Sequence, residues 1–326
     1  MGITAIGTGV ADDADGGSPA ERLSTRVDGV EVLGALSPSR AADFLTCPLL
    51  YRFRTVDRLP EPPSVDAMRG TVVHQVLEDI FDLPAAERTP ERAQAMVAPV
   101  WEQILLDHPE AALMFADPDG APGGAPGAVT GAAPDAARWL VSCRDSVRRW
   151  YDLEDPRRLE PAERELYVEA LLESKLLLRG FIDRVDEAPD GALRLNDYKT
   201  GKAPREGFEG RPLFQLRFYA LALWRSRGVV PRVLQLVYLG SGEVITYEPD
   251  EHDLLATERK VEAVWRAITH AQRTGDWQPS RGPLCGWCAH QALCPAWGGT
   301  PPPLPEPSAT APPQPGAGAS GLEPSG

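Results

Sequence analysis

The sequence predicts an α/β protein in which a core sheet is flanked by helices. Residues 180 to 200 carry apolar side chains at alternate positions on both sides of a turn, which is typical of a β-hairpin. After this hairpin, strand and helix patterns alternate as far as residue 274, whereas residues 66 to 153 have mainly helical spacing. Alternating strands and helices favour an α/β core, and we expect the helical block to cover it.

Three helices in the N-terminal half have recognisable boundaries or amphipathic patterns. The first has Ser37 as its N-cap and Pro38 at its first position, and it runs toward Cys47. Two amphipathic helices are predicted over residues 90 to 107 and 135 to 153.

The helix predicted over residues 66 to 83 combines a core stripe with polar side chains. His74 and Glu78 are four residues apart and therefore share one face. The apolar residues of the adjoining stripe recur at helical spacing and are Met68, Val72, Val73, Val76, Leu77 and Ile80.

The elements around the hairpin complete the core. A strand is predicted near residues 164 to 173, and a helix over about 212 to 227 follows the hairpin. Strands over 233 to 239 and 243 to 247 then precede a long helix over about 251 to 274.

The hairpin turn, Pro-Asp-Gly at residues 189 to 191, suggests how the two strands pair. If the turn closes symmetrically, Ala188 pairs with Ala192, and counting outward places Asp183 directly opposite Asp197. A bulge would shift this pairing by one residue.

Two facing carboxylates among apolar side chains repel each other and require positive charge between them. Lys199 follows Asp197 by two residues, so both side chains project from the same face of the strand. A divalent cation held by Asp183 and Asp197 would complete the neutralisation, and oxygen ligands suit Mg²⁺ or Mn²⁺.

Composition limits the class of protein and its setting. With 326 residues and 43% hydrophobic content, the chain can bury a large core. It has no apolar stretch near 18 residues and no basic-then-apolar start, so we expect a cytoplasmic protein without a membrane span. Its five cysteines, an odd number, favour metal binding or reactive thiols over a disulfide framework.

The net charge of −14 argues against tight binding of nucleic acid by this chain alone. Part of this charge lies in the terminal stretches, but the remainder of the chain is still acidic. DNA binding would therefore need a local basic channel or a basic partner.

Three low-complexity stretches set the predicted domain boundaries. Residues 1 to 35 and the Pro-rich residues 298 to 326 are predicted to be disordered tails. Residues 117 to 135 are predicted to form a flexible surface loop within one domain that spans residues 36 to 297.

The order of Asp183, a hairpin and Asp197-x-Lys199 resembles the core of the PD-(D/E)XK nuclease superfamily. The resemblance covers about residues 36 to 297, and several motifs in family order are more specific than any single one. The motifs that narrow it to RecB-family nucleases are residues 36 to 40 (LSPSR), Cys47-Pro48 followed by Tyr51, and residues 69 to 74 (RGTVVH), 180 to 184 (GFIDR), 197 to 201 (DYKTG) and 215 to 219 (QLRFY).

This resemblance implies a restriction-endonuclease-like fold and a role for each matching residue. Lys199 orients the water or the scissile phosphate, and Gln215 and Tyr219 line the active site and contact the substrate. The implied ligands of Mg²⁺ or Mn²⁺ are His74, Asp183, Asp197 and the backbone carbonyl of Tyr198.

Each of these residues also has a plainer interpretation when it is considered alone. His74 could be a half-buried helix histidine, and Asp197 could form an ordinary ion pair with Lys199. Glu165 and Glu169, on the strand before the hairpin, are weaker candidates for a supporting carboxylate, and the predicted site does not include them.

The cysteines form a second constellation. Cys47 could join the C-terminal cysteines only if both ends of the domain meet in space, and four thiolates suit Zn²⁺ as well as an iron–sulfur cluster. Cys143 lies on an apolar helix face and is predicted to be a core residue. The C-terminal thiols, which resemble the [4Fe–4S] type of the family found in AddB-type and CRISPR-associated relatives, are Cys285, Cys288 and Cys294.

Two functions are compatible with these patterns. One is a metal-dependent DNA exonuclease of the RecB type that acts on single-stranded ends in repair or recombination. The other is an accessory iron–sulfur DNA-binding module that acts with a helicase or another partner and has little catalysis of its own. The chain has no Walker A sequence, so a helicase would be a separate partner. The intact Asp183, Asp197 and Lys199 favour the enzyme, and the acidic charge favours dependence on a partner.

Overall fold

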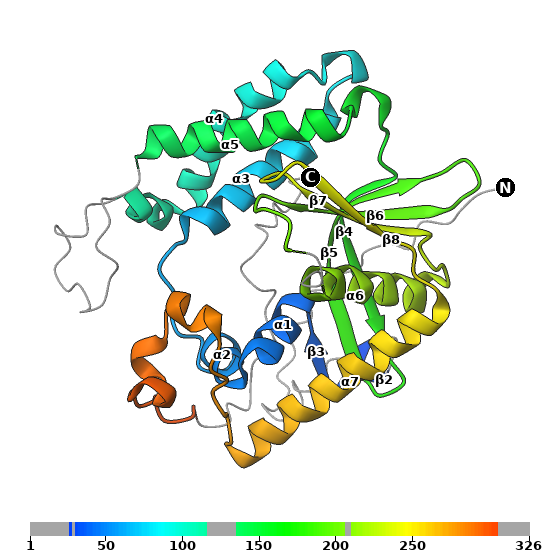
Figure 1. Ribbon diagram of the computed structural model, residues 1–326. Coiled ribbons are helices and arrows are strands. Elements are labelled where there is room, and N and C mark those ends of the chain that lie inside the picture. Colours follow the sequence, from blue (N-terminus) through cyan, green and yellow to red (C-terminus); the bar gives the residue numbers. More distant parts are fainter. Residues whose placement is uncertain (1–25, 28–29, 116–134, 206–209, 306–326) are drawn as a thin grey trace, which may run out of the picture.

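A computed structural model describes residues 26–27, 30–115, 135–205 and 210–305 (Figure 1). Nearly all of the predicted loop over 117 to 135 lies outside the described residues, as do most of the predicted tail over 1 to 35 and residues 306 to 326.

The core is a mixed six-stranded sheet organised around one long strand, β5 (Leu176–Glu187). β4 (Glu163–Leu171) pairs antiparallel with β5 along one edge. On the other edge, β3 (Gly34–Leu36) pairs parallel with the start of β5, and β6 (Leu193–Lys199) pairs antiparallel with its end. β7 (Val233–Tyr238) and β8 (Glu243–Tyr247) extend the sheet beyond β6. A separate small ladder joins β1 (Arg26–Val27) to β2 (Val30–Glu31).

Helices cover both faces of the sheet, as expected for an α/β core (Figure 1). One hydrophobic cluster lies between the sheet and α1 (Pro38–Thr46), α2 (Pro48–Tyr51), α6 (Gly210–Arg227) and α7 (Glu251–Thr274). The other lies between the sheet and α3 (Val65–Asp79), α4 (Pro90–Asp107) and α5 (Ala136–Leu153). No helix in the described ranges has both the length and the apolar composition needed to cross a membrane.

Short helical turns connect these elements. Most are 3₁₀ turns, which are frequent at helix ends and as connectors. They are a π-helical segment at Arg52–Val56 and 3₁₀ segments at Ile80–Asp82, Ala85–Glu87, Pro109–Phe115, Pro156–Arg158, Pro283–Trp287, Gln291–Leu293 and Pro295–Trp297.

The hairpin has the predicted register. The ladder pairs Arg184 with Asn196 without a bulge, so the next position outward places Asp183 opposite Asp197. Beyond Arg184 and Asn196 a side chain takes over the role of the backbone acceptor: Asp183 Oδ2 accepts a hydrogen bond of 2.7 Å from the backbone N of Tyr198. The pairing between β5 and β6 therefore ends where the two carboxylates face each other.

Two segments near the predicted domain boundaries differ from the sequence expectation. β3 begins at Gly34, inside the predicted N-terminal tail, because it pairs with a distant part of β5. Residues 298 to 305 of the predicted C-terminal tail lie against the fold, where the buried Arg52 donates a hydrogen bond to the carbonyl oxygen of Pro302. Both contacts join residues far apart in sequence, so no local pattern reports them.

Candidate active site

The predicted site residues meet where β5 has no ladder partner on one edge, between its pairing with β3 and its pairing with β6. Strand β5 supplies Asp183, and the neighbouring end of β6 supplies Asp197 and Lys199. Helix α3 supplies His74 from above, and α6 supplies Gln215 with Tyr219 (Figure 1).

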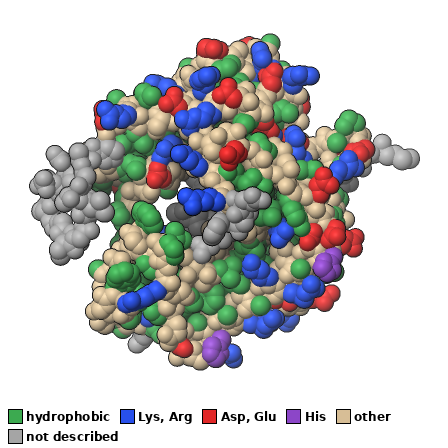
Figure 2. Space-filling model, viewed as in Figure 1, with side chains coloured by type: hydrophobic (Ala, Val, Ile, Leu, Met, Phe, Trp, Pro, Cys, Tyr) green, Lys and Arg blue, Asp and Glu red, His purple; other side chains and the backbone are tan. Residues whose placement is uncertain are grey.

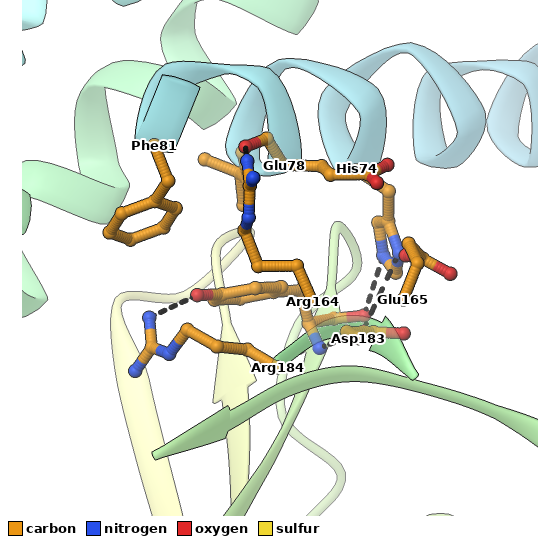
Figure 3. Close-up of a pocket in the computed structure, with 9 residues that line it drawn as sticks. His74, Glu78, Phe81, Arg164, Glu165, Asp183 and Arg184 are labelled. Carbon is orange, nitrogen blue, oxygen red and sulfur yellow. Dashed lines mark hydrogen bonds and ion pairs between the residues drawn. The ribbon is translucent and has the colours of Figure 1, made fainter. Parts of the chain in front are cut away.

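His74 links α3 to both hairpin strands (Figure 3). Its Nε2 donates a hydrogen bond of 2.9 Å to the carbonyl oxygen of Tyr198, and its Nδ1 lies 3.5 Å from Asp183 Oδ2. The same Asp183 oxygen accepts the bond from the Tyr198 N–H. His74 therefore contacts two other predicted metal-binding groups, the Asp183 carboxylate and the Tyr198 carbonyl.

Glu165 belongs to this cluster, although the sequence prediction left it out. Its carboxylate, the His74 ring and the Asp183 carboxylate have ligand atoms that all lie within 4.8 Å of one another. In the β4–β5 ladder, pairing skips the position where Glu165 would face Asp183, and Glu165 has a φ of 42°. Such a φ is uncommon for a residue other than glycine and is often found at functional sites.

The cluster surrounds a cavity of about 10 Å³, which has room for roughly one water molecule or one ion. Burial raises the pKa of Glu165 to about 8, and the charges of Asp183, Glu78 and Asp197 add to this effect. The raised pKa reflects negative charge gathered in a partly enclosed space, and a cation at this position would relieve it.

Asp197 and Lys199 form the second half of the site. Asp197 is 2% exposed, and its Oδ2 lies 2.6 Å from Lys199 Nζ. Burial raises the pKa of Asp197 to about 6, although Lys199 opposes the shift and Asp183 adds to it. Burial alone would lower the pKa of Lys199, but the charges of Asp197 and Asp183 outweigh it and raise that pKa, so Lys199 is an ammonium group.

Helix α6 holds Lys199 from the other side. Lys199 Nζ donates a hydrogen bond of 2.9 Å to Gln215 Oε1, and Gln215 Nε2 donates one of 3.2 Å to the Tyr219 hydroxyl. The structure therefore brings the predicted polar face of this helix to Lys199.

Gly180 allows Tyr219 to approach β5 closely. A Cβ added at Gly180 would lie 2.5 Å from Tyr219 Cε1, a distance at which the ring has to move. We expect Gly180→Ala to displace the tyrosine and to lower both the melting temperature and the turnover number. The control is Gly210→Ala, at the start of the same helix, because an added Cβ there meets nothing within 4 Å. Equal melting temperatures and turnover for the two variants would contradict this role of Gly180.

A wider groove leads to these residues. It has a volume of about 390 Å³ and runs between one face of α3, from Asp66 to His74, and the end of β6, from Tyr198 to Gly201. Figure 2 shows that this face of the molecule is hollowed near its middle and that Lys and Arg side chains gather at the edge of the hollow. The groove and the cavity share His74 and Tyr198 in their linings.

The two ends of the domain meet at the cysteines. Ser280 N donates a hydrogen bond of 3.3 Å to Cys47 Sγ, and the Ser280 carbonyl lies 3.9 Å from Cys285 Sγ. Burial raises the pKa of Cys288, and the charges of Cys47 and Cys294 add to the shift. No disulfide joins any of the five cysteines.

The sulfur atoms of the cysteines lie further apart than the ligand atoms around His74. In the described ranges, two groups have ligand atoms within 4.8 Å of one another, the one at His74 and an exposed one at Asp250, His252 and Asp253, and neither contains a cysteine. Cys143 is fully buried in the helical cluster, which confirms its prediction as a core residue.

Comparison with known proteins places these observations in a family. Residues 35–295 match the model of the PD-(D/E)XK nuclease superfamily. The "Gene 69 protein" of Mycobacterium phage D29 is 29% identical over 217 residues, which are 59% of this chain and 70% of the phage protein. Its namesake in Mycobacterium phage L5 is 30% identical over 123 residues, 37% of this chain and 40% of that protein.

A solved structure of a candidate exonuclease from Eubacterium rectale has 14% sequence identity and a TM-score of 0.49, and the match covers 78% of this chain and 87% of that one. The family match is the broader result, because it spans most of the chain and includes every residue placed around the cavity and beside Lys199. The chain belongs to the PD-(D/E)XK nuclease superfamily.

Proposed function

We propose that this protein is a divalent-metal-dependent deoxyribonuclease of the RecB type, an exonuclease that hydrolyses phosphodiester bonds at single-stranded DNA ends during repair or recombination. The observation that carries the proposal is the small cavity where the ligand atoms of His74, Glu165 and Asp183 converge, beside the Lys199–Asp197 pair. A water-sized space among carboxylates next to a lysine is suited to hydrolysis of a phosphate ester.

The donor atoms fit a hard divalent cation. They are carboxylate oxygens, one imidazole and a backbone carbonyl, which suit Mg²⁺ and Mn²⁺ better than soft metals. Asp197 Oδ2 is buried without a hydrogen-bond partner and has only the ion pair with Lys199. When bound at His74, Asp183, Asp197 and the Tyr198 carbonyl, with Glu165 beside them, Mg²⁺ or Mn²⁺ would lower the pKa of a water molecule and offset the charge on the phosphate.

The side chains orient the reactants around this position. The Tyr198 N–H and His74 Nδ1 both contact Asp183 Oδ2, which fixes the position of this carboxylate. Lys199 has three N–H donors; it donates one to Gln215 and forms an ion pair with Asp197, so an N–H remains that can donate to a phosphate oxygen or to the attacking water. Tyr219 holds Gln215 in place for this contact.

The raised pKa values predict a pH-dependent response to metal. Without metal, the fold gains stability from Asp197 and Glu165 as the pH falls through about 6 and about 8, respectively, and loses it as the pH rises. Mg²⁺ competes with these protons, so we expect it to raise the melting temperature more at about pH 8.5 than at about pH 5.5. In Asp197→Asn this difference should shrink. An equal increase at both pH values in the wild type would contradict a metal site at these carboxylates.

The groove between α3 and β6 is the proposed path of the DNA strand. An added Cβ at Gly70 would lie 3.9 Å from Thr200 Oγ1, so a larger side chain there points into the groove without displacing the fold. We expect Gly70→Leu to lower kcat/KM for DNA by about tenfold or more, with little change in Mg²⁺ affinity measured by calorimetry. Gly70→Ala is the matched control and should retain most of its activity. Full activity of Gly70→Leu would exclude this path.

We also propose a [4Fe–4S] cluster held by Cys47, Cys285, Cys288 and Cys294, with Zn²⁺ as the less favoured occupant. Two observations support this proposal. The backbone of Ser280 contacts both Cys47 Sγ and Cys285 Sγ, and the charges of Cys47 and Cys294 contribute to the raised pKa of Cys288. Gly282 N also donates to Cys285 Sγ at 3.3 Å, and backbone N–H donors to sulfur are among the features that tune iron–sulfur sites. The cluster would then have a structural role, because it would join α1 and α2 to the C-terminal segment that carries Cys285, Cys288 and Cys294.

The test of the main proposal is an assay with end-labelled single- and double-stranded DNA in Mg²⁺ or Mn²⁺. We expect shortening of the labelled strands that requires metal and is lost in Asp197→Ala. The net charge of −14 favours a second candidate, an accessory DNA-binding module that depends on a helicase or another basic partner. DNA binding without cleavage in either metal would favour that module and reject the autonomous nuclease.

A further inference from the structure

A buried cluster of charges contacts the hydroxyl end of the Tyr198 side chain, and its Arg184 is also among the residues that line the small cavity. Arg184, whose side chain is 1% exposed, forms a two-pronged ion pair with Glu154, with N–O distances of 2.7 and 2.9 Å. Its Nε also lies 3.0 Å from Asp186 Oδ1. Arg184 and Asp186 come from β5, whereas Glu154 is the residue that ends α5.

Stability alone is a weak explanation for this cluster. Removing an arginine and a glutamate from water costs several kcal/mol per ion, and well-packed apolar residues often serve a fold equally well. Neighbouring side chains nevertheless support it, because Trp150 Nε1 donates to Glu154 at 2.7 Å and Asn196 Nδ2 donates to Asp186 at 2.8 Å. In the described residues Arg184 Nε and Asn196 Oδ1 lack a hydrogen-bond partner, but the two bonds to Glu154 and the ion pair with Asp186 hold the guanidinium in one position.

The guanidinium group of Arg184 contacts the side chain of Tyr198. Arg184 Nη1 donates a hydrogen bond to the Tyr198 hydroxyl, and its guanidinium carbon lies 5.5 Å from the centre of the Tyr198 ring (Figure 3). Trp150 contacts the same ring edge-on, with centroids 6.1 Å apart. The Tyr198 side chain, 3% exposed, is therefore held on several sides.

The backbone of Tyr198 is part of the candidate active site. Its N–H donates to Asp183 at 2.7 Å, and its carbonyl accepts from His74 at 2.9 Å. One residue thus connects the charge cluster, through its ring, to two proposed metal-binding groups, through its peptide atoms. A change in the position of the ring would move both of these groups.

We propose that Arg184 and Glu154 are positioning residues, which hold Tyr198 so that its carbonyl and the Asp183 carboxylate keep the separation that a divalent ion requires. This inference rests on the proposed metal site. The same pair fastens α5 to the sheet, and α5 packs against α3, which carries His74. Arg184 and Glu154 therefore set the distance between the helical block and the hairpin at the point where the ligands meet.

Arg88 provides a matched control for Arg184. It is also buried, lies 5.2 Å from the centre of an aromatic ring, Phe81, and pairs with a glutamate, Glu160, at 2.9 Å. Its other hydrogen bonds go to the backbone carbonyls of Phe81 and Leu83, between α3 and α4, and of Pro156 and Leu159, after α5. Arg88→Lys therefore disturbs a comparable buried arginine that contacts the cavity lining at Phe81 but, among the residues that the structure describes, bonds to neither Tyr198 nor a proposed metal-binding group.

The test compares Arg184→Lys, Tyr198→Phe and Arg88→Lys in two measurements besides cleavage. Calorimetry gives the Mn²⁺ dissociation constant, and hydrogen exchange of the metal-free protein reports the Tyr198 N–H that is bonded to Asp183. We expect Arg184→Lys to weaken Mn²⁺ binding about tenfold, as loss of a residue that orients metal ligands does, and to speed exchange of the Tyr198 amide. Arg88→Lys should lower the melting temperature and leave both quantities unchanged.

Tyr198→Phe removes only the hydroxyl that Arg184 contacts, so it keeps the test decisive if Arg184→Lys folds poorly. It should shift both quantities in the same direction, and adding it to Arg184→Lys should have little further effect. Wild-type Mn²⁺ affinity and amide exchange in Arg184→Lys and Tyr198→Phe would overturn the positioning role alone. If the wild-type protein binds no Mn²⁺, the proposed function fails, and amide exchange in the metal-free variants still decides whether Arg184 holds the Tyr198 backbone.

Discussion

Lys199→Ala is expected to lower metal-dependent DNA cleavage by about 100-fold or more, the usual cost of removing a donor that stabilises charge in the transition state. Lys199 is the cation between Asp197 and Gln215, and it has one N–H left for the substrate. The measurement is the single-turnover rate on end-labelled DNA at saturating Mg²⁺.

The control is Lys202→Ala, because Lys202 is exposed and lies three residues further along the chain. This variant should cleave like the wild type. Circular dichroism should show that Lys199→Ala is folded, since the raised pKa of Asp197 allows that carboxyl to bind a proton when the ammonium is absent. Cleavage by purified Lys199→Ala at the wild-type rate would remove Lys199 from the catalytic site.

Cys47→Ala is expected to remove the bound iron and to lower the melting temperature in the same step, because metal-binding energy at such a site is folding energy. Anaerobically purified wild-type protein should be brown, with about four irons per chain and broad absorption near 400 nm, as a [4Fe–4S] cluster requires. Iron content and thermal unfolding should fall together in each of the four variants at Cys47, Cys285, Cys288 and Cys294.

Cys143→Ala provides the contrast. Cys143 is buried among α3, α4 and α5, and burial raises its pKa to about 11, so it remains a neutral thiol. Its loss should leave the iron content unchanged, even where the melting temperature drops. A colourless wild-type protein with one bound zinc would reject the iron–sulfur cluster but still support a structural metal site that joins the two ends of the domain. A metal-free protein with the same melting temperature as Cys47→Ala would reject both.

Local patterns in the sequence were sufficient to place most of the hairpin site. The Pro-Asp-Gly turn fixes the pairing register of the two hairpin strands from Ala188 outward. The placement of Asp183 opposite Asp197 therefore follows from the local turn sequence. The Lys199 contact follows from the two-residue period of a strand. The boundaries of α4, α7 and β8 were equally accessible, because their amphipathic or alternating patterns are uninterrupted.

Glu165 shows what such patterns miss. Its place beside His74 depends on pairing between β4 and β5 and on a local backbone distortion, neither of which leaves a periodic signal. The useful signal would have been its position opposite Asp183 once β4 and β5 are aligned antiparallel. The partnership of Arg184 with Glu154 is hidden for a similar reason, because α5 and β5 meet only in the folded protein.

The contacts between the two ends of the domain also determine the order in which the protein can be completed during synthesis. Cys47 meets Ser280 across 233 residues, and Arg52 meets Pro302 across 250. Contacts of such long sequence separation form late, after the intervening chain has left the ribosome. The contacts of Cys47 and Arg52 must therefore wait for the last segment, while the strands that carry the candidate active site can already pair. A nascent chain would pass through a stage in which the site is nearly assembled and the two ends of the domain are not yet joined.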